Sequence, residues 1–156
     1  MPQSVRMHDD DAWGVLERAH TGVLTSLRRD GWPISLPVWF VALDRRVYVA
    51  GPEPTKKFAR IRHDPRVSFV VESGTAWAEL VGVHLTGRAT FLGSGTHLDR
   101  VTAALQTKYE AFRTPRSEMP AATRARYEVA IATIEIVPDA RVIAWDNARM
   151  FAPEPP

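Results

Sequence analysis

A hydroxyl and two ammonium groups stand side by side in the run Thr55-Lys56-Lys57. The run follows a break at residues 51–54 and opens the segment 55–63, whose apolar spacing predicts a short helix with Thr55 as its N-cap. The first turn of a helix presents unpaired N–H groups and the positive end of the helix dipole. Together these groups predict a phosphate-binding site. Adjacent lysines are also common on solvated faces, so the residues alone leave that second interpretation open.

A second candidate feature is the segment Pro33 to Ala42, which predicts a strand that contains two prolines. Pro33 and Pro37 lack the N–H that an inner strand of a sheet needs, so unpaired backbone groups are expected beside Trp39. Such groups suit a flat heterocycle with amide edges, such as a flavin. The alternative is a plain edge strand whose tryptophan belongs to the core.

Several kinds of site are excluded by what the chain lacks. It contains no cysteine, which excludes disulfides, thiolate nucleophiles, cysteine-ligated zinc and iron–sulfur clusters. Its five histidines show no metal-binding spacing, and no Gly-x-Ser-x-Gly, Walker or Gly-x-Gly-x-x-Gly motif occurs. Glu79 and His84 fall in a predicted strand. Each could carry a proton in a reaction, but side chains in such positions are more commonly solvated or paired. We therefore expect no metal site and no catalytic protein nucleophile; a cofactor would carry the chemistry.

The composition is that of a globular chain: 156 residues, 45% hydrophobic and 24% charged, with a formal net charge of +2. The arginines are scattered along the sequence, which argues against nucleic-acid binding. No apolar run approaches ~20 residues, so we expect no membrane span. Residues 1–11 lack a secretory signal pattern, which favours a cytoplasmic protein. The length predicts one domain over residues 1–156, with flexible ends at 1–8 and 152–156.

The hydrophobic periodicity predicts a mainly β fold with flanking helices. The strands are joined mostly by tight turns such as Asp30-Gly31, which indicates about six antiparallel strands, best satisfied as a barrel. Asp9 to Asp11 are expected to cap the first helix, Gly22 to end it, and Gly82 to form a bulge in the longest strand. The predicted helices are 9–20, 55–63, 96–112 and 121–127, and the predicted strands are 21–27, 33–42, 47–50, 67–72, 77–92, 130–137 and 142–145.

Over nearly its full length the chain resembles the pyridoxamine 5′-phosphate oxidase-like split β-barrel superfamily, which binds FMN or the deazaflavin coenzyme F420. The resemblance rests on pieces that occur in the family's order, of which the block from Lys57 to Asp64-Pro65-Arg66-Val67 is the most specific. It implies a six-stranded antiparallel split β-barrel and a homodimer with two cofactor sites at the subunit interface. The pieces are TGVLTSL, DGWPISLPVWF, RRVYVA, EPTKKFARIRHDPRVSF, WAELVGVHLTGRA and IEIVP followed by RVIAWD.

The resemblance also implies roles for individual residues. The hydroxyl–basic–basic triplet would hold the cofactor phosphate, one strand would run beside the ring, and the end of the next strand would flank the ribityl chain. A tryptophan of the partner subunit is a further implied contact. The phosphate would be held by Thr55, Lys56 and Lys57, and the ring would lie beside Leu36, Pro37, Val38 and Trp39. The ribityl chain would be flanked by Ala50 and Gly51, and the contact from the partner subunit would be Trp77.

Two departures separate the chain from the vitamin B6 oxidases of this superfamily. Gly82 stands about where those enzymes carry a glutamine, and the end reads AWDNARMF instead of Arg-Leu-His-Asp-Arg. The residue patterns EP-x-x-K and RHDPRV and the arginine-rich composition are more similar to the deazaflavin-using branch of actinobacteria. The resemblance thus implies an F420-dependent reductase that transfers a hydride to a small organic substrate. The alternatives are an FMN-binding flavin reductase or oxidase, and a non-catalytic module that stores a cofactor or binds haem.

Overall fold

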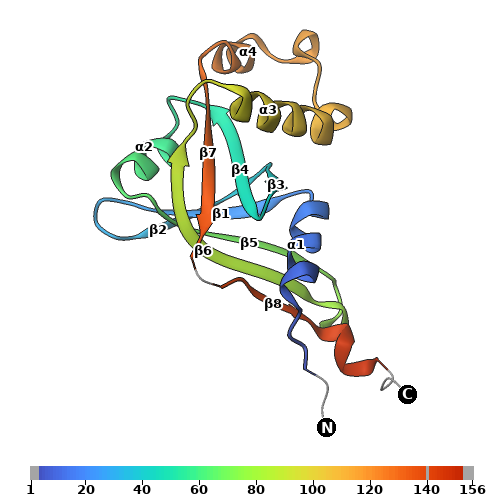
Figure 1. The fold of residues 1–156 in the computed structure, drawn as a ribbon. Helices are drawn as coiled ribbons and strands as arrows, with labels where there is room; N and C mark the ends of the chain where they lie inside the picture. The colour runs from blue at the N-terminus through green and yellow to red at the C-terminus, as the bar shows by residue number, and fades with distance from the viewer. Residues whose placement is uncertain (1–3, 140, 153–156) are drawn as a thin grey trace.

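The computed structural model describes residues 4–139 and 141–152 (Figure 1). Four α-helices and eight strands occur in these residues. The helices are α1 (Asp9–Arg18), α2 (Lys56–His63), α3 (Thr96–Tyr109) and α4 (Ala121–Tyr127). The strands are β1 (Gly22–Leu27), β2 (Pro33–Val38), β3 (Val41–Leu43), β4 (Arg46–Pro52), β5 (Arg66–Ser73), β6 (Val81–Phe91), β7 (Ile131–Pro138) and β8 (Ile143–Asp146).

All strand pairs are antiparallel and form one curved sheet in the order β2-β1-β5-β6-β7-β4-β3, with β8 also paired to β6. The predicted mainly β split barrel with flanking helices is confirmed, but it has eight strands rather than six. One cause is that the predicted strand 33–42 breaks at Trp39 and Phe40. The Phe40 N–H donates to the Tyr109 hydroxyl (2.9 Å) instead of to a neighbouring strand, and its ring is fully buried.

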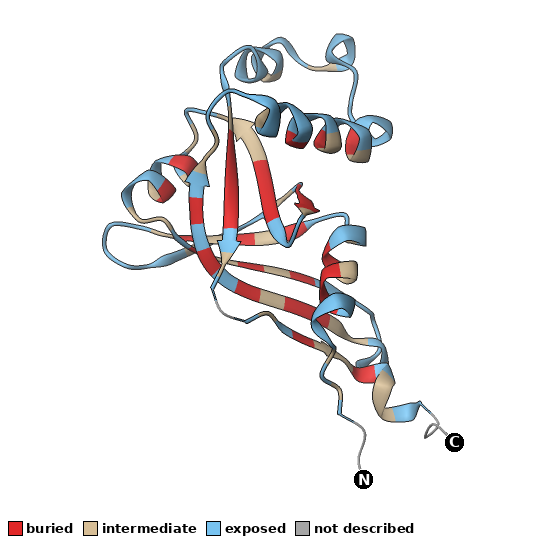
Figure 2. Cartoon of the chain, in the orientation of Figure 1, coloured by how far each residue is buried: buried red, intermediate tan, exposed pale blue. Residues whose placement is uncertain are grey.

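The main core fills the inside of the curved sheet. In β1 and β5, buried residues alternate with half-buried or exposed ones, as the period of two requires, and the helices add buried residues of their own (Figure 2). Leu16 of α1 and Phe58 of α2 belong to this core. Helix α3 covers the other side of β3 and β4, where Tyr48 packs with Val101 and Leu105. The helices therefore close surfaces that the sheet leaves open.

The long predicted strand 77–92 is shorter in the structure. Trp77–Glu79 forms a 3-10 turn, and β6 begins at Val81. Gly82 is not a bulge, because it keeps regular register with Glu72 and Trp145. A Cβ at Gly82 would lie 2.1 Å from the Trp145 ring, so the glycine serves a close approach between β6 and β8.

The first helix also differs in detail from the prediction. Asp9 to Asp11 occupy its first turn, where their charges suit the helix dipole, but the N-cap is His8. The helix ends at Arg18, and Gly22 begins β1. Met7 N–H donates to Ala144 O (3.1 Å), so the described start of the chain lies along β8; residues 1–3 and 153–156 of the predicted flexible ends lie outside the described residues. None of the described helices has the length and hydrophobicity that a membrane crossing requires.

Candidate functional site

The end of β4 and the start of α2 carry five of the residues predicted to bind a cofactor: Ala50, Gly51, Thr55, Lys56 and Lys57. β4 is held in place by its ladder with β7, which extends through Gly51 and Pro52. The turn that follows is closed by hydrogen bonds from Glu53 N–H to Ala130 O and from Thr55 N–H to Glu53 O, both 2.8 Å. Thr55 is the N-cap residue of α2, as predicted.

The hydroxyl of Thr55 is buried without a hydrogen-bond partner among the described residues. It does not cap α2, although an N-cap threonine ordinarily bonds to an N–H of the first turn. Leaving a buried polar group unpaired costs about 1–3 kcal/mol. A phosphate oxygen at this place would satisfy both the hydroxyl and the free N–H groups of the first turn.

Lys57 points back toward β4. Its Nζ lies 2.9 Å from the position that a Cβ on Gly51 would occupy, and 4.7 Å from the centroid of the Phe58 ring. Burial lowers the pKa of the half-buried Lys57 ammonium. Within the described part of the chain no carboxylate forms an ion pair with it. A half-buried cation without a counter-ion, next to an unpartnered hydroxyl, fits a phosphate group.

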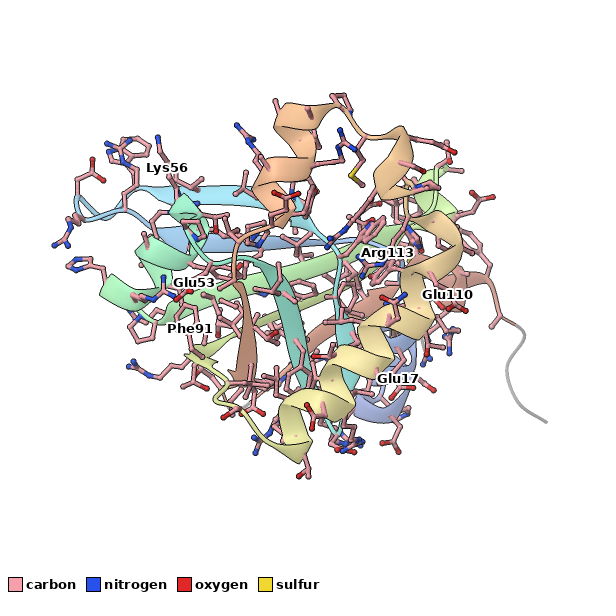
Figure 3. The ribbon with its side chains drawn as sticks, turned by 90° about the horizontal axis from the view of Figure 1, so that it is seen from above. Glu17, Glu53, Lys56, Phe91, Glu110 and Arg113 are labelled. Atoms are coloured by element: carbon pink, nitrogen blue, oxygen red, sulfur yellow. The ribbon has the colours of Figure 1, made fainter. Side chains whose placement is uncertain are left out.

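Lys56 lies instead beside the β1–β2 hairpin (Figure 3). It lines a cleft of about 500 Å³ between this hairpin and α2, which we call the hairpin cleft. The two consecutive lysines therefore face different spaces. The cleft is lined by Arg28, Arg29, Ile34, Lys56, Ala59 and Arg60.

β2 is an edge strand whose outer backbone is poor in donors. It ends the sheet, and among the described strands only β1 pairs with it. The bond from Arg28 N–H to Trp32 O (2.9 Å) and the register with β1 turn the backbone groups of Pro33, Ser35 and Pro37 to the outer edge. Proline has no N–H, so this edge offers carbonyls and the single N–H of Ser35. An edge with so few donors cannot form a full ladder with another strand, but it suits a ligand that has both donors and acceptors.

The residues predicted to line the ring lie on this edge strand and its end. Leu36 is 39% exposed, Pro37 is exposed and Val38 is half-buried. Trp39 is 37% exposed and stacks on Tyr109, with 4.4 Å between ring centroids and an interplanar angle of 1°. The edge strand predicted as an alternative is therefore present, but its tryptophan is not a core residue.

Trp77 is not near the Thr55–Lys57 site within one chain. It lies in the 3-10 turn between β5 and β6, at the end of the sheet away from α2 (Figure 1), where 64% of it is exposed. Its carbonyl accepts a hydrogen bond from Asn147 Nδ2 (2.7 Å). Glu79, expected in a strand, lies in the same turn, and its carboxylate accepts a hydrogen bond from Ala76 N–H (3.3 Å).

Sequence reasoning missed the cations that share the hairpin cleft with Lys56. Arg60 follows Lys56 by four residues, so helical spacing alone places both on one face of α2. Arg28 and Arg29 reach the same cleft only because β1 packs against α2. No local pattern relates the hairpin turn to a helix that begins some 25 residues later.

The sequence model of the pyridoxamine 5′-phosphate oxidase family matches residues 9–138 of the chain. The chain belongs to this family. The matched range contains the whole α2 site and the β2 edge. No curated protein sequence matches the chain.

Solved structures share the fold of this family member at low sequence identity. A conserved hypothetical protein from Mycobacterium tuberculosis has a TM-score of 0.79 and 23% identity, over 98% of this chain and 93% of its own. A protein described as FAD-binding, from Mesorhizobium loti, has a TM-score of 0.68 and 21% identity, over 88% and 94%. A haem-binding protein from Mycobacterium smegmatis has a TM-score of 0.65 and 17% identity, over 90% and 58%. These likenesses describe the fold.

Proposed function

We propose that this oxidase-family protein is an oxidoreductase that uses coenzyme F420 and transfers a hydride between it and a small organic substrate. The observation that carries the proposal is the pair formed by the unpartnered, buried Thr55 hydroxyl and the half-buried Lys57 ammonium at the start of α2. Both groups gain a partner if the phosphate of a cofactor lies between them. When bound, the deazaflavin supplies the hydride chemistry.

The chain's own residues hold and orient the cofactor. Thr55, Lys57 and the free N–H groups of the first turn of α2 bind its phosphate. The absence of a side chain at Gly51 leaves room for the Lys57 ammonium. Leu36 to Trp39 would line the ring, and the outward carbonyls of Pro33, Ser35 and Pro37 would accept hydrogen bonds from its donors.

A second copy of the chain completes the site in this proposal. β2 is mostly exposed along its length, and Trp77 is a large exposed aromatic side chain at the opposite end of the sheet. In a homodimer the β2 face of one copy is covered, and Trp77 of the other copy closes the ring pocket. Covering the ring excludes water from the transferred hydride.

The choice of F420 over FMN rests on the resemblance of the sequence to the deazaflavin-using branch. FMN is the alternative cofactor, because its ring and first phosphate have the same shape. The FAD-binding name of a solved relative favours this flavin alternative. A cofactor-storing module without activity would use the same residues and would bind without turnover.

The test is a fluorescence titration of ligand-free protein with F420 and with FMN, on wild type and Lys57→Ala. We expect Lys57→Ala to weaken binding by about tenfold or more, because a partly desolvated phosphate loses a charged partner. Arg124→Ala, which removes an exposed cation on α4, is the matched control and should leave the affinity unchanged. Unchanged affinity in Lys57→Ala would contradict the site.

The same titration and a turnover assay separate the three functions. Tighter F420 binding, followed by oxidation of reduced F420 in the presence of a conjugated acceptor, supports the reductase. Tighter binding of FMN than of F420 supports the FMN-dependent enzyme instead. Tight binding without turnover of any acceptor supports the storage module instead.

A further inference from the structure

The hairpin cleft gathers four cationic side chains. Arg28 and Arg29 come from the β1–β2 turn, and Lys56 and Arg60 come from one face of α2; Ile34 and Ala59 form the apolar floor. Arg28 pairs with Asp30 (2.7 Å). Neither Arg29 nor Lys56 makes an ion pair with any other described residue. Like charges gathered in one cleft repel each other, and an anionic ligand would offset that repulsion.

The cleft is built from firmly held parts. The Arg60 guanidinium donates from Nε to the hydroxyl of Ser26 (2.9 Å), a residue only 2% exposed. That contact fixes the guanidinium while leaving its terminal N–H groups for a ligand. The hairpin turn is closed by hydrogen bonds from Gly31 N–H to Arg28 O (2.9 Å) and from Trp32 N–H to Asp30 Oδ1 (3.2 Å). The Arg60 guanidinium and the backbone that carries Arg28 and Arg29 are therefore held in place before any ligand arrives.

A large aromatic side chain stands on the same face of the hairpin. The β1–β2 register pairs Ser26 with Ile34, and the next hydrogen-bonded pair is Arg28 with Trp32. Because side chains on a strand alternate between faces, Trp32 shares the face of Ile34 and Arg28, which line the cleft. Trp32 is 68% exposed and does not itself line the cleft, so its indole is open to a part of a ligand that extends beyond the cleft along this face.

We propose that the hairpin cleft and Trp32 form a second binding site, which takes a nucleoside phosphate. Arg29, Lys56 and Arg60 bind the phosphate oxygens, since guanidinium groups match phosphate geometry with paired hydrogen bonds. The base stacks on Trp32, as bases stack on exposed aromatic side chains in sites that combine stacking with positive charge. The volume of about 500 Å³ lies in the range of small-molecule sites.

This site is separate from the phosphate site at Thr55 and Lys57, because Lys56 and Lys57 face different spaces. Two sources supply the same chemistry. The nucleoside phosphate is either the adenylate half of a dinucleotide flavin whose first phosphate binds Thr55 and Lys57, or a free nucleotide. The first source rests on the flavin alternative of the proposed function, and the second is independent of the proposed function.

The experiment measures the affinities of the full chain for ADP, FMN, FAD and F420 by calorimetry. The variants are Trp32→Ala, Arg29→Ala and Lys57→Ala, with Trp32→Phe as the conservative variant and Arg124→Ala as the control. Trp32 and Arg29 are exposed residues of a turn, so their replacement should leave the melting temperature unchanged.

We expect wild type to bind ADP, and Trp32→Ala and Arg29→Ala each to weaken that binding by about tenfold. Trp32→Phe should retain most of the wild-type affinity for ADP, and Lys57→Ala should leave ADP binding unchanged. FAD binding tighter than FMN by about tenfold, with the advantage lost in Trp32→Ala, identifies the dinucleotide as the source. ADP binding with equal affinities for FAD and FMN identifies a free nucleotide.

Two results would overturn the inference. One is no ADP binding together with equal FAD and FMN affinities. The other is that Arg29→Ala weakens F420 alone while Trp32→Ala changes nothing, which would assign the cleft to an acidic group without a base. If wild type binds neither FMN nor F420 but binds ADP in a way that depends on Trp32, the proposed function is refuted and this second site is supported.

Discussion

Two regions of the molecule bury polar side chains, and they do so in opposite ways. Beneath α3, the Glu135 carboxylate accepts hydrogen bonds from Tyr48 Oη (2.9 Å) and Arg46 (2.8 Å), and His97 Nε2 lies 3.1 Å from it. At the start of α2, the Thr55 hydroxyl has no partner and the Lys57 ammonium has no counter-ion among the described residues. The first region is closed on itself, whereas the second is open to a ligand.

The pKa shifts express the same contrast. Burial and the hydrogen bond to Glu135 raise the pKa of Tyr48 to about 12. Burial by itself would raise the pKa of Glu135, but the hydrogen bonds from Tyr48 and His97 and the charge of Arg46 outweigh it and lower that pKa. For Lys57 burial acts alone and lowers the pKa of its ammonium. A buried polar group that no neighbour satisfies is thus the better indicator of a ligand site.

The largest effect should come from opening the closed region. Glu135→Ala removes the acceptor of the buried Tyr48 hydroxyl and should lower the free energy of unfolding by about 2 kcal/mol. Chemical denaturation measures it, and Glu118→Ala, at an exposed glutamate, is the matched control. Cofactor affinity should not change, and a loss of affinity at full folding would show that the two regions are coupled.

Gly51→Ala should disturb the open region without unfolding the chain. The new Cβ would lie 2.9 Å from Lys57 Nζ, so the flexible ammonium must move away. We expect cofactor affinity to fall by about fivefold or more, with the melting temperature nearly unchanged. Gly93→Ala, where nothing lies within 4 Å, is the control. A lower melting temperature with normal affinity would mean that Lys57 does not bind the ligand.

Thr55→Val should separate stability from binding. The isosteric methyl group removes an unsatisfied buried hydroxyl, so the free energy of unfolding should stay the same or rise by up to about 1 kcal/mol. The same change should weaken cofactor binding, while Thr55→Ser should retain it. Denaturation and titration of the three proteins test this. Destabilisation by Thr55→Val would show that the hydroxyl already has a partner in the ligand-free protein.

The smallest effects concern pH, and they lie at opposite ends of the scale. The pKa of Glu135 is lower in the folded state, so its contribution to stability is present above about 4.5 and is lost as pH falls through the folded pKa. The pKa of Lys57 is also lower in the folded state, so its unfavourable contribution fades as pH rises toward 10.5. Unfolding across pH should show these slopes in wild type, the first absent in Glu135→Gln and the second in Lys57→Met. A wild-type slope kept in either variant would assign it to another group.

Local features were predictable where local physics decides them. The helix at 56–63 and its N-cap Thr55 follow from a cap residue, a preceding break and helical spacing. The edge position of β2 follows from two prolines, because each removes a backbone donor. By contrast, the sequence predicts a bulge at Gly82, which is wrong because nothing in the sequence relates this glycine to the Trp145 ring.

A mainly antiparallel split barrel, the family, and a hydroxyl with two lysines at the start of a helix can thus all be inferred from the residues alone. The packing of the elements in three dimensions places Lys57 beside Gly51 and Lys56 beside the hairpin arginines. It also pairs Tyr48 with Glu135, which is 87 residues away, and stacks Trp39 on Tyr109. Caps, turns and periodicity depend on neighbours in the chain, whereas these contacts depend on strand register and helix packing, which no short stretch of sequence specifies.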